Sequence, residues 1–208
     1  YYFGGSFKPS RVDTKFIPLN KNDKLLLFGG ILSDNALFPE KGKSQISLNY
    51  DDKGNLFAMY GYSLSNIFQL EIDTGYFNNV NLVDNKNFNL KDTYLSQNNF
   101  HYRVGGKLLI FSPQKNDAFW LALRTTLGRN NENKQGYLFS ELISTFRFND
   151  WIAFNFSPKY FFSGVKSFGA LGISSYISLF DNLMLIPEIN TSIINESEVN
   201  TTLALRYS

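Results

Sequence analysis

GYLFSELISTFRFNDWIAFNFSPKYFF, residues 136–162, opens the stretch that decides the fold, which continues to Ser208. It contains two strand-length segments, Gly136–Phe148 and Trp151–Phe162, joined by the two-residue turn Asn149-Asp150. Three further segments follow: Phe168–Phe180, Leu183–Ile194 and Asn200–Ser208. Most alternate apolar with polar residues, as strands with one buried face do. They are nine to thirteen residues long, whereas ordinary strands average about 5–6 residues and a tilted membrane-crossing strand needs about 9–11. The stretch therefore predicts long strands of membrane-spanning length.

The same pattern extends back to Ser44 through five more segments: Ser44–Tyr50, Asn55–Ser63, Ile67–Phe77, Asn98–Ser112 and Ala118–Arg129. The connections alternate between two sets. The short set is Leu64–Asn66, Pro113–Asp117, Asn149-Asp150 and Asp181-Asn182. The longer, more polar set is Asp51–Gly54, Asn78–Gln97, Asn130–Gln135, Ser163–Ser167 and Asn195–Val199. Short periplasmic turns opposite long outer loops are typical of outer-membrane barrels. Residues 44–208 are therefore expected to form an all-β, antiparallel up-and-down transmembrane β-barrel of about ten strands.

Residues 1–43 are expected to form a separate N-terminal segment that supplies short strands, a plug or the end of an upstream domain. Within it, Thr14–Leu19 and Lys24–Leu32 have the pattern of a hairpin, which would raise the strand count to about twelve. The string Lys8–Arg11 followed by Lys24–Gly30 resembles part of one kelch propeller repeat, in which a strand ends in a glycine pair. The stretch Ser33–Ser44, with its proline and glycine, is expected to be a loop. Because no leader precedes the first residue, we expect a mature form or a portion of a longer chain.

Charged residues separate from apolar ones when each strand is sorted by parity, because successive side chains point to opposite faces. In the third segment, for example, Phe68, Leu70 and Ile72 share one face and the acids share the other. We expect ten charges to line the barrel interior: Glu71, Asp73, Arg103, Lys107, Arg124, Glu141, Arg147, Lys159, Glu188 and Arg206. An unpaired charge in a low-dielectric interior costs several kcal/mol, so these side chains are expected to pair as a belt. Such a belt would either plug the barrel or line a narrow path for ions and small polar solutes.

The bulk composition excludes several classes of function. The chain has 208 residues, a net charge of +2 and no cysteine. The small charge argues against nucleic-acid binding, and the absence of cysteine excludes disulfides, thiolate metal sites and cysteine nucleophiles. A mean hydropathy of −0.20 is too polar for a helical membrane protein. In a barrel, apolar lipid-facing residues alternate with polar lumen-facing ones, so the mean hydropathy stays low. Aromatic residues make up 17% of the chain, which suits strands and interfacial girdles.

Enzyme signals are sparse. The single histidine, His101, is expected on the inward face near the outer rim, where Asp73 on the preceding strand could pair with it for base chemistry. No Gly-x-Ser-x-Gly elbow, metal-spaced cluster or phosphate-cradling loop occurs. We therefore expect no enzymatic activity, no cofactor and no metal, with a rim-active outer-membrane hydrolase as an alternative. Pro158 and Pro187 lie inside predicted strands, and a bulge is expected at each because proline removes a ladder donor.

Across Ser44–Ser208 the pattern resembles the small monomeric outer-membrane barrels of Gram-negative bacteria. Such proteins end on alternating apolar residues with a terminal aromatic; Leu203, Leu205 and Tyr207 fit this signal, although Ser208 follows the aromatic. The resemblance implies a location in the bacterial outer membrane, with lipid as partner. It implies a passive function, either as a structural and anchoring barrel or as a narrow porin-like channel. The alternative is an adhesion barrel that binds lipopolysaccharide or an extracellular partner through Asn78–Gln97.

Overall fold

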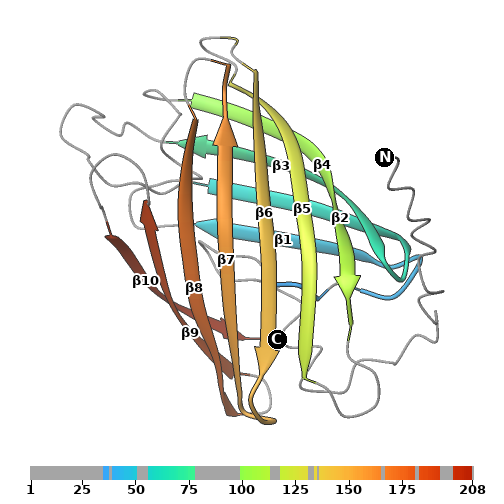
Figure 1. Ribbon diagram of the computed structural model, residues 1–208, viewed down its shortest axis with the longest axis vertical. Helices are drawn as coiled ribbons and strands as arrows, with labels where there is room; N and C mark the ends of the chain where they lie inside the picture. Colours follow the sequence, from blue (N-terminus) through green and yellow to red (C-terminus); the bar gives the residue numbers. More distant parts are fainter. Residues whose placement is uncertain are drawn as a thin grey trace, which may run out of the picture.

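A computed structural model gives the fold of residues 35–37, 39–50, 56–77, 99–112, 118–130, 134, 136–164, 167–180, 183–192 and 199–207. These residues form ten strands: β1 (Ser44–Tyr50), β2 (Leu56–Ser65), β3 (Phe68–Phe77), β4 (Asn99–Phe111), β5 (Phe119–Asn130), β6 (Gly136–Arg147), β7 (Ile152–Phe162), β8 (Ser167–Phe180), β9 (Leu183–Ser192) and β10 (Val199–Tyr207). Each strand is hydrogen-bonded to the next in sequence order, and every pair is antiparallel (Figure 1). The all-β, up-and-down fold of ten strands is therefore confirmed.

The strand boundaries lie within two residues of the ranges expected from sequence. The alternating pattern succeeds because a residue's face in a strand depends only on local backbone geometry. The hairpin expected between residues 14 and 32, and with it the count of twelve strands, falls outside the described residues, as does the kelch-like string. In the described part of the chain, no helix is long and apolar enough to span a membrane.

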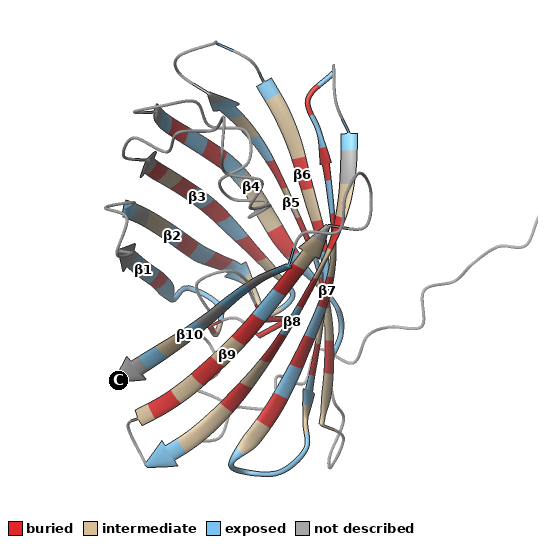
Figure 2. Cartoon of the chain, turned by 90° about the vertical axis from the view of Figure 1, so that its left-hand side faces the viewer, coloured by how far each residue is buried: buried red, intermediate tan, exposed pale blue. Residues whose placement is uncertain are grey.

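The sheet is strongly curved, so that its strands wrap around a shared interior (Figure 2). We call the face that lines this interior the inner face and the opposite face the outer face. β1 and β10 are the two edges of the sheet, and no ladder joins them within the described residues. With an even number of alternating strands these two edges run antiparallel, which is the orientation that closure into a barrel requires.

The two prolines inside strands do not produce the expected bulges. Pro158 pairs with Leu171 of β8, and Pro187 pairs with Leu203 of β10, with no register shift at either position. On the opposite sides, the β6–β7 and β8–β9 ladders skip the prolines and resume in the same register. A proline whose ring replaces the N–H on the skipped side removes one ladder bond without adding a residue. The register shifts that occur lie instead at strand ends beside short connections, at Ser63/Ser65, Leu109/Phe111 and Ser178/Phe180.

The inner face is filled in three layers along the strands. At the end that carries the short connections lies an apolar layer, made of Ala36, Leu37, Trp120, Ala122, Ile143, Ala153, Tyr176, Met184 and Ile186. At the end that carries the long connections lies a smaller aromatic layer, in which Tyr137 packs against Phe139, Phe161 and Ala170. Charged side chains occupy the level between them. Along β3 to β9 the buried positions alternate with exposed or half-buried ones, whereas the described side chains of β10 are exposed or half-buried (Figure 2).

Candidate functional site: a buried belt of charges

Eight ionisable side chains from six strands lie buried between the two apolar layers, and we call them the charged belt. They are Glu71 and Asp73 of β3, Arg103 and Lys107 of β4, Arg124 of β5, Glu141 of β6, Lys159 of β7 and Glu188 of β9. None is more than 6% exposed. Four acids face four bases, so the formal charges of the belt cancel. This cancellation matters because a buried charge is tolerated only when a partner compensates its lost hydration.

The register of neighbouring strands brings most belt residues face to face. Arg124 is the ladder partner of Glu141, which in turn is the ladder partner of Lys159. Lys107 is also directly opposite Arg124, and two like charges in that position destabilise a sheet. Glu71 resolves the conflict, because its Oε2 accepts a hydrogen bond from Arg124 Nε at 2.5 Å and its Oε1 lies 4.0 Å from Lys107 Nζ.

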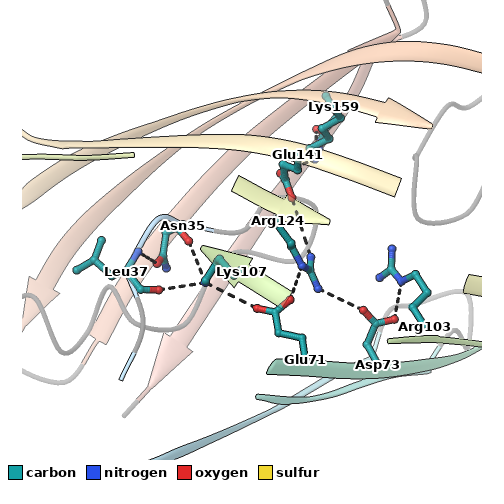
Figure 3. Close-up of polar contacts among 10 residues, drawn as sticks. Asn35, Leu37, Glu71, Asp73, Arg103, Lys107, Arg124, Glu141 and Lys159 are labelled. Atoms are coloured by element: carbon teal, nitrogen blue, oxygen red, sulfur yellow. Dashed lines mark hydrogen bonds and ion pairs between the residues drawn. The ribbon is translucent and has the colours of Figure 1, made fainter. Parts of the chain in front are cut away.

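Arg124 is the centre of the network (Figure 3). Besides Glu71, its guanidinium donates to Asp73 Oδ2 at 3.2 Å and lies 4.0 Å from Glu141 Oε2. A planar guanidinium carries five N–H donors in a fixed fork, so a single arginine can serve several carboxylates. One cation from β5 therefore links acids of β3 and β6, which lie on both sides of it.

The belt ends in polar and aromatic contacts on either side of this centre. Arg103 Nε donates to Asp73 Oδ1 at 2.5 Å, and the Arg103 guanidinium lies 5.4 Å from the centre of the Phe139 ring. At the other end, Lys159 Nζ lies 3.6 Å from Glu141 Oε1 and donates to Asn190 Oδ1 at 2.9 Å. The belt is thus continuous from β3 to β9, and cation–π attraction ties it to the aromatic layer.

A short segment that precedes β1 enters this interior. Lys107 Nζ donates to the backbone carbonyls of Asn35 and Leu37, each at 3.1 Å (Figure 3). The backbone N–H of Ala36 donates to Thr145 Oγ1 of β6 at 2.9 Å. All three segment residues are at most 1% exposed. Sequence reasoning placed residues 33–44 in a loop and gave a plug as one alternative for residues 1–43, but it did not single out this segment; the apolar run Ala36–Phe38 inside a polar stretch was the one available signal.

Of the ten charges expected in the interior, eight form the belt and one, Arg147, lies outside it. Arg147 is half-buried at the short-connection end, where its guanidinium lies 5.6 Å from the centre of the Trp120 ring. Arg147 stands at the last position of β6, three alternations beyond Glu141, so parity places it on the right face but beyond the level of the belt. The side chain of Arg206 lies outside the described residues. Glu188 is buried on β9 opposite Ser174 of β8.

In the imidazole–acid pair considered from sequence, the acid, Asp73, is bound by two arginines. His101 is 1% exposed at the long-connection end of β4. Asp73 uses one carboxylate oxygen for Arg103 and the other for Arg124. An acid held by two guanidiniums is a poor partner for orienting a histidine that must take up a proton. Among the described residues, no three His, Cys, Asp or Glu side chains gather as a metal site.

No protein-family model matches this chain, and no curated protein matches it in sequence. The chemistry of the charged belt itself therefore has to indicate its role. It holds opposite charges in fixed geometry between two apolar layers, and none of its groups has the arrangement of a nucleophile beside a base. Such a network stabilises one packing of the interior, and it presents a charged path only where water reaches it.

Gly172 of β8 marks how tightly the Lys159 end of the belt is packed. A Cβ at this position would lie 2.6 Å from Ser157 Oγ, 2.7 Å from Asn190 Oδ1 and 3.1 Å from Lys159 Cε. We expect Gly172→Ala to lower the free energy of unfolding by about 1–3 kcal/mol, the usual cost of overpacking. Chemical unfolding of the refolded protein measures the change. Gly136→Ala is the matched control, since its Cβ would meet nothing closer than 3.8 Å; equal losses in both variants would contradict the packing argument.

Proposed function

We propose that the chain forms a closed β-barrel in the outer membrane of a Gram-negative bacterium and acts there as a passive structural anchor with an occluded interior. The observation that carries the proposal is an inverted distribution of polarity. The outer face exposes apolar side chains, while eight charges are buried inside. A soluble protein has the opposite arrangement, because water solvates surface charges and excludes apolar groups.

The apolar outer face extends over all ten strands. One row of consecutive ladder partners runs from β2 to β5 through Tyr60, Ile72, Val104 and Leu127, which are 44%, 57%, 53% and 63% exposed. Contiguous apolar patches larger than a few hundred Å² are rare on soluble monomers. A band of outward apolar and aromatic side chains around long tilted strands is what lipid tails would cover in a membrane barrel.

Closure of the barrel is part of the proposal. The outward residues Ile46 and Leu48 of β1 are 65% and 70% exposed, and Leu203 and Leu205 of β10 are each 67% exposed. Both edges thus present the same apolar outer face. In lipid, an open edge would leave backbone N–H and C=O groups without partners at several kcal/mol each. Pairing of β1 with β10 removes that cost.

The filled interior favours an anchor over an open pore. The formal charges of the belt cancel, and apolar side chains are buried on the inner face at both ends of it. Small barrels of about eight to ten strands are usually filled by side chains in this way. The adhesion alternative depends on Asn78–Gln97, which lies outside the described residues, and the hydrolase alternative depends on an Asp73 that is held by two arginines.

Refolding into lipid tests the proposal. The detergent-refolded protein is expected to float with phospholipid vesicles in a density gradient and to migrate faster on gels before heating than after, since folded membrane barrels resist dodecyl sulfate. In planar bilayers it is expected to conduct little. Urea-denatured protein, which should neither float nor show two bands, is the control. A chain that stays monomeric and folded in buffer without detergent would overturn the proposal.

A further inference from the structure

We propose that Asn35–Leu37 is an internal plug that closes the barrel at its short-connection end, and that its displacement opens a path through the charged belt for small ions. This inference rests on the proposed membrane barrel. It adds a movable element and a transport activity to what would otherwise be a passive anchor.

The segment lies deep in the interior. Asn35, Ala36 and Leu37 are 0%, 0% and 1% exposed, although none belongs to a strand. The side chain of Leu37 packs in the apolar layer beside residues of β5 to β9. Asn35 Oδ1 accepts a hydrogen bond from the backbone N–H of Leu37 at 2.9 Å, which holds the segment in a tight turn. Leu37 is thus part of the seal at that end of the interior.

The barrel wall supplies the partners of the segment's backbone. The ammonium of Lys107 on β4 donates hydrogen bonds to two carbonyls, and the hydroxyl oxygen of Thr145 on β6 accepts one from the N–H of Ala36. Lys107 faces the like charge of Arg124, and its Nζ lies 4.0 Å from Glu71 Oε1. The two carbonyl dipoles therefore complete the solvation of a buried cation. The segment and the belt stabilise each other.

The segment can leave without disrupting a strand. It precedes β1 and contributes no pair to any ladder. Hydrogen bonds to Lys107 and Thr145 and the packing of Ala36 and Leu37 in the apolar layer hold it, whereas each strand is held by ladders along its length. Its departure would admit water to Lys107, Glu71 and Arg124. A hydrated row of alternating charges passes small ions and selects among them by size and sign.

Single-channel recording in planar bilayers tests the plug. The variant Leu37→Ala/Thr145→Val removes the apolar seal and the acceptor for Ala36 N–H without changing a charge. Losing such contacts shifts an equilibrium by roughly tenfold or more, so its mean conductance is expected to exceed that of the unmodified protein by roughly tenfold. Thr126→Val is the matched control, because Thr126 is buried on the same inner face and its hydroxyl has no hydrogen-bond partner among the residues that the structure describes. It is expected to leave conductance unchanged.

A reversible lock gives a second test, since the chain has no cysteine of its own. Ala36 N lies 2.9 Å from Thr145 Oγ1, so the two residues are neighbours, and a disulfide between cysteines at these positions would tie the segment to β6. Ala36→Cys/Thr145→Cys is expected to be silent when oxidised and to conduct after reduction. The plug would be refuted, and the barrel left intact, if Leu37→Ala/Thr145→Val or the reduced Ala36→Cys/Thr145→Cys protein inserts into bilayers and is heat-modifiable, yet conducts no more than the unmodified protein. Failure of the unmodified protein to insert would instead refute the proposed function.

The rate of thiol alkylation tests the position of the segment even where a conductance variant does not fold. Leu37→Cys in the refolded protein is expected to react with a small thiol reagent far more slowly than Lys41→Cys, because Leu37 is buried and Lys41 is exposed. Unfolding in urea should bring the two rates together. Equal rates in the folded protein would show that the segment does not stay in the interior, and would end the plug proposal.

Discussion

Replacing Arg124 by methionine is expected to lower the free energy of unfolding by about 3–5 kcal/mol, as removal of one partner from a buried ion pair typically does. The guanidinium hydrogen-bonds Glu71 and Asp73 and lies 4.0 Å from Glu141. Methionine fills much of the same volume but leaves the belt with four acids and three bases. One negative charge is then buried without compensation, and water or a proton must enter to relieve it.

Urea unfolding in detergent micelles, followed by tryptophan fluorescence, measures this loss. Arg129→Met is the control, because Arg129 lies on the same strand and is exposed; an exposed substitution usually changes stability by no more than about 0.5 kcal/mol. Adding Glu71→Gln to Arg124→Met removes the excess acid and is expected to recover part of the stability. Equal losses for Arg124→Met and Arg129→Met would contradict the central role of Arg124.

The second large effect is expected on the outer face, where Ile72→Arg should destabilise the folded state in lipid vesicles by about 2–4 kcal/mol. Ile72 is 57% exposed and follows Glu71 directly, so it lies at the level of the belt, far from both ends of β3. An arginine there would place its charge in the hydrocarbon core if lipid surrounds the barrel. On a protein surrounded by water the same change would fall within about 0.5 kcal/mol.

Phe148→Arg is the control for depth. Phe148 is 67% exposed beside the Asn149-Asp150 turn, at the end of β6, where an arginine reaches water and should cost about 0–1 kcal/mol. Equilibrium refolding into phospholipid vesicles, monitored by the heat-modifiable shift on gels, compares the two. A difference in vesicles that disappears in detergent would support a lipid-facing band. If both variants refold as well as the unmodified chain in vesicles, the membrane proposal fails.

Most of the fold could be predicted because a strand's pattern is local. The segment Ser44–Tyr50 was predicted to the residue, and the other boundaries came within two. Parity also separated Glu141 from Leu142, the first buried and the second 39% exposed. Prolines were harder to place. The effect of a proline on the sheet depends on which neighbouring strand loses a hydrogen bond, and this cannot be seen from one strand alone. The bulges predicted at Pro158 and Pro187 were therefore wrong.

By itself, the sequence determined the ten long strands, the connections that alternate in length, and the face on which each charge stands. These follow from the two-residue period of an extended chain, which needs no knowledge of distant residues. Only the tertiary structure decided which charges meet, because Arg124 and Glu71 are 53 residues apart and converge through sheet curvature and register. It alone brought the carbonyls of Asn35 and Leu37 to Lys107. A backbone acceptor leaves no mark in the side-chain pattern, and a buried ammonium takes whichever oxygens the folded chain places beside it.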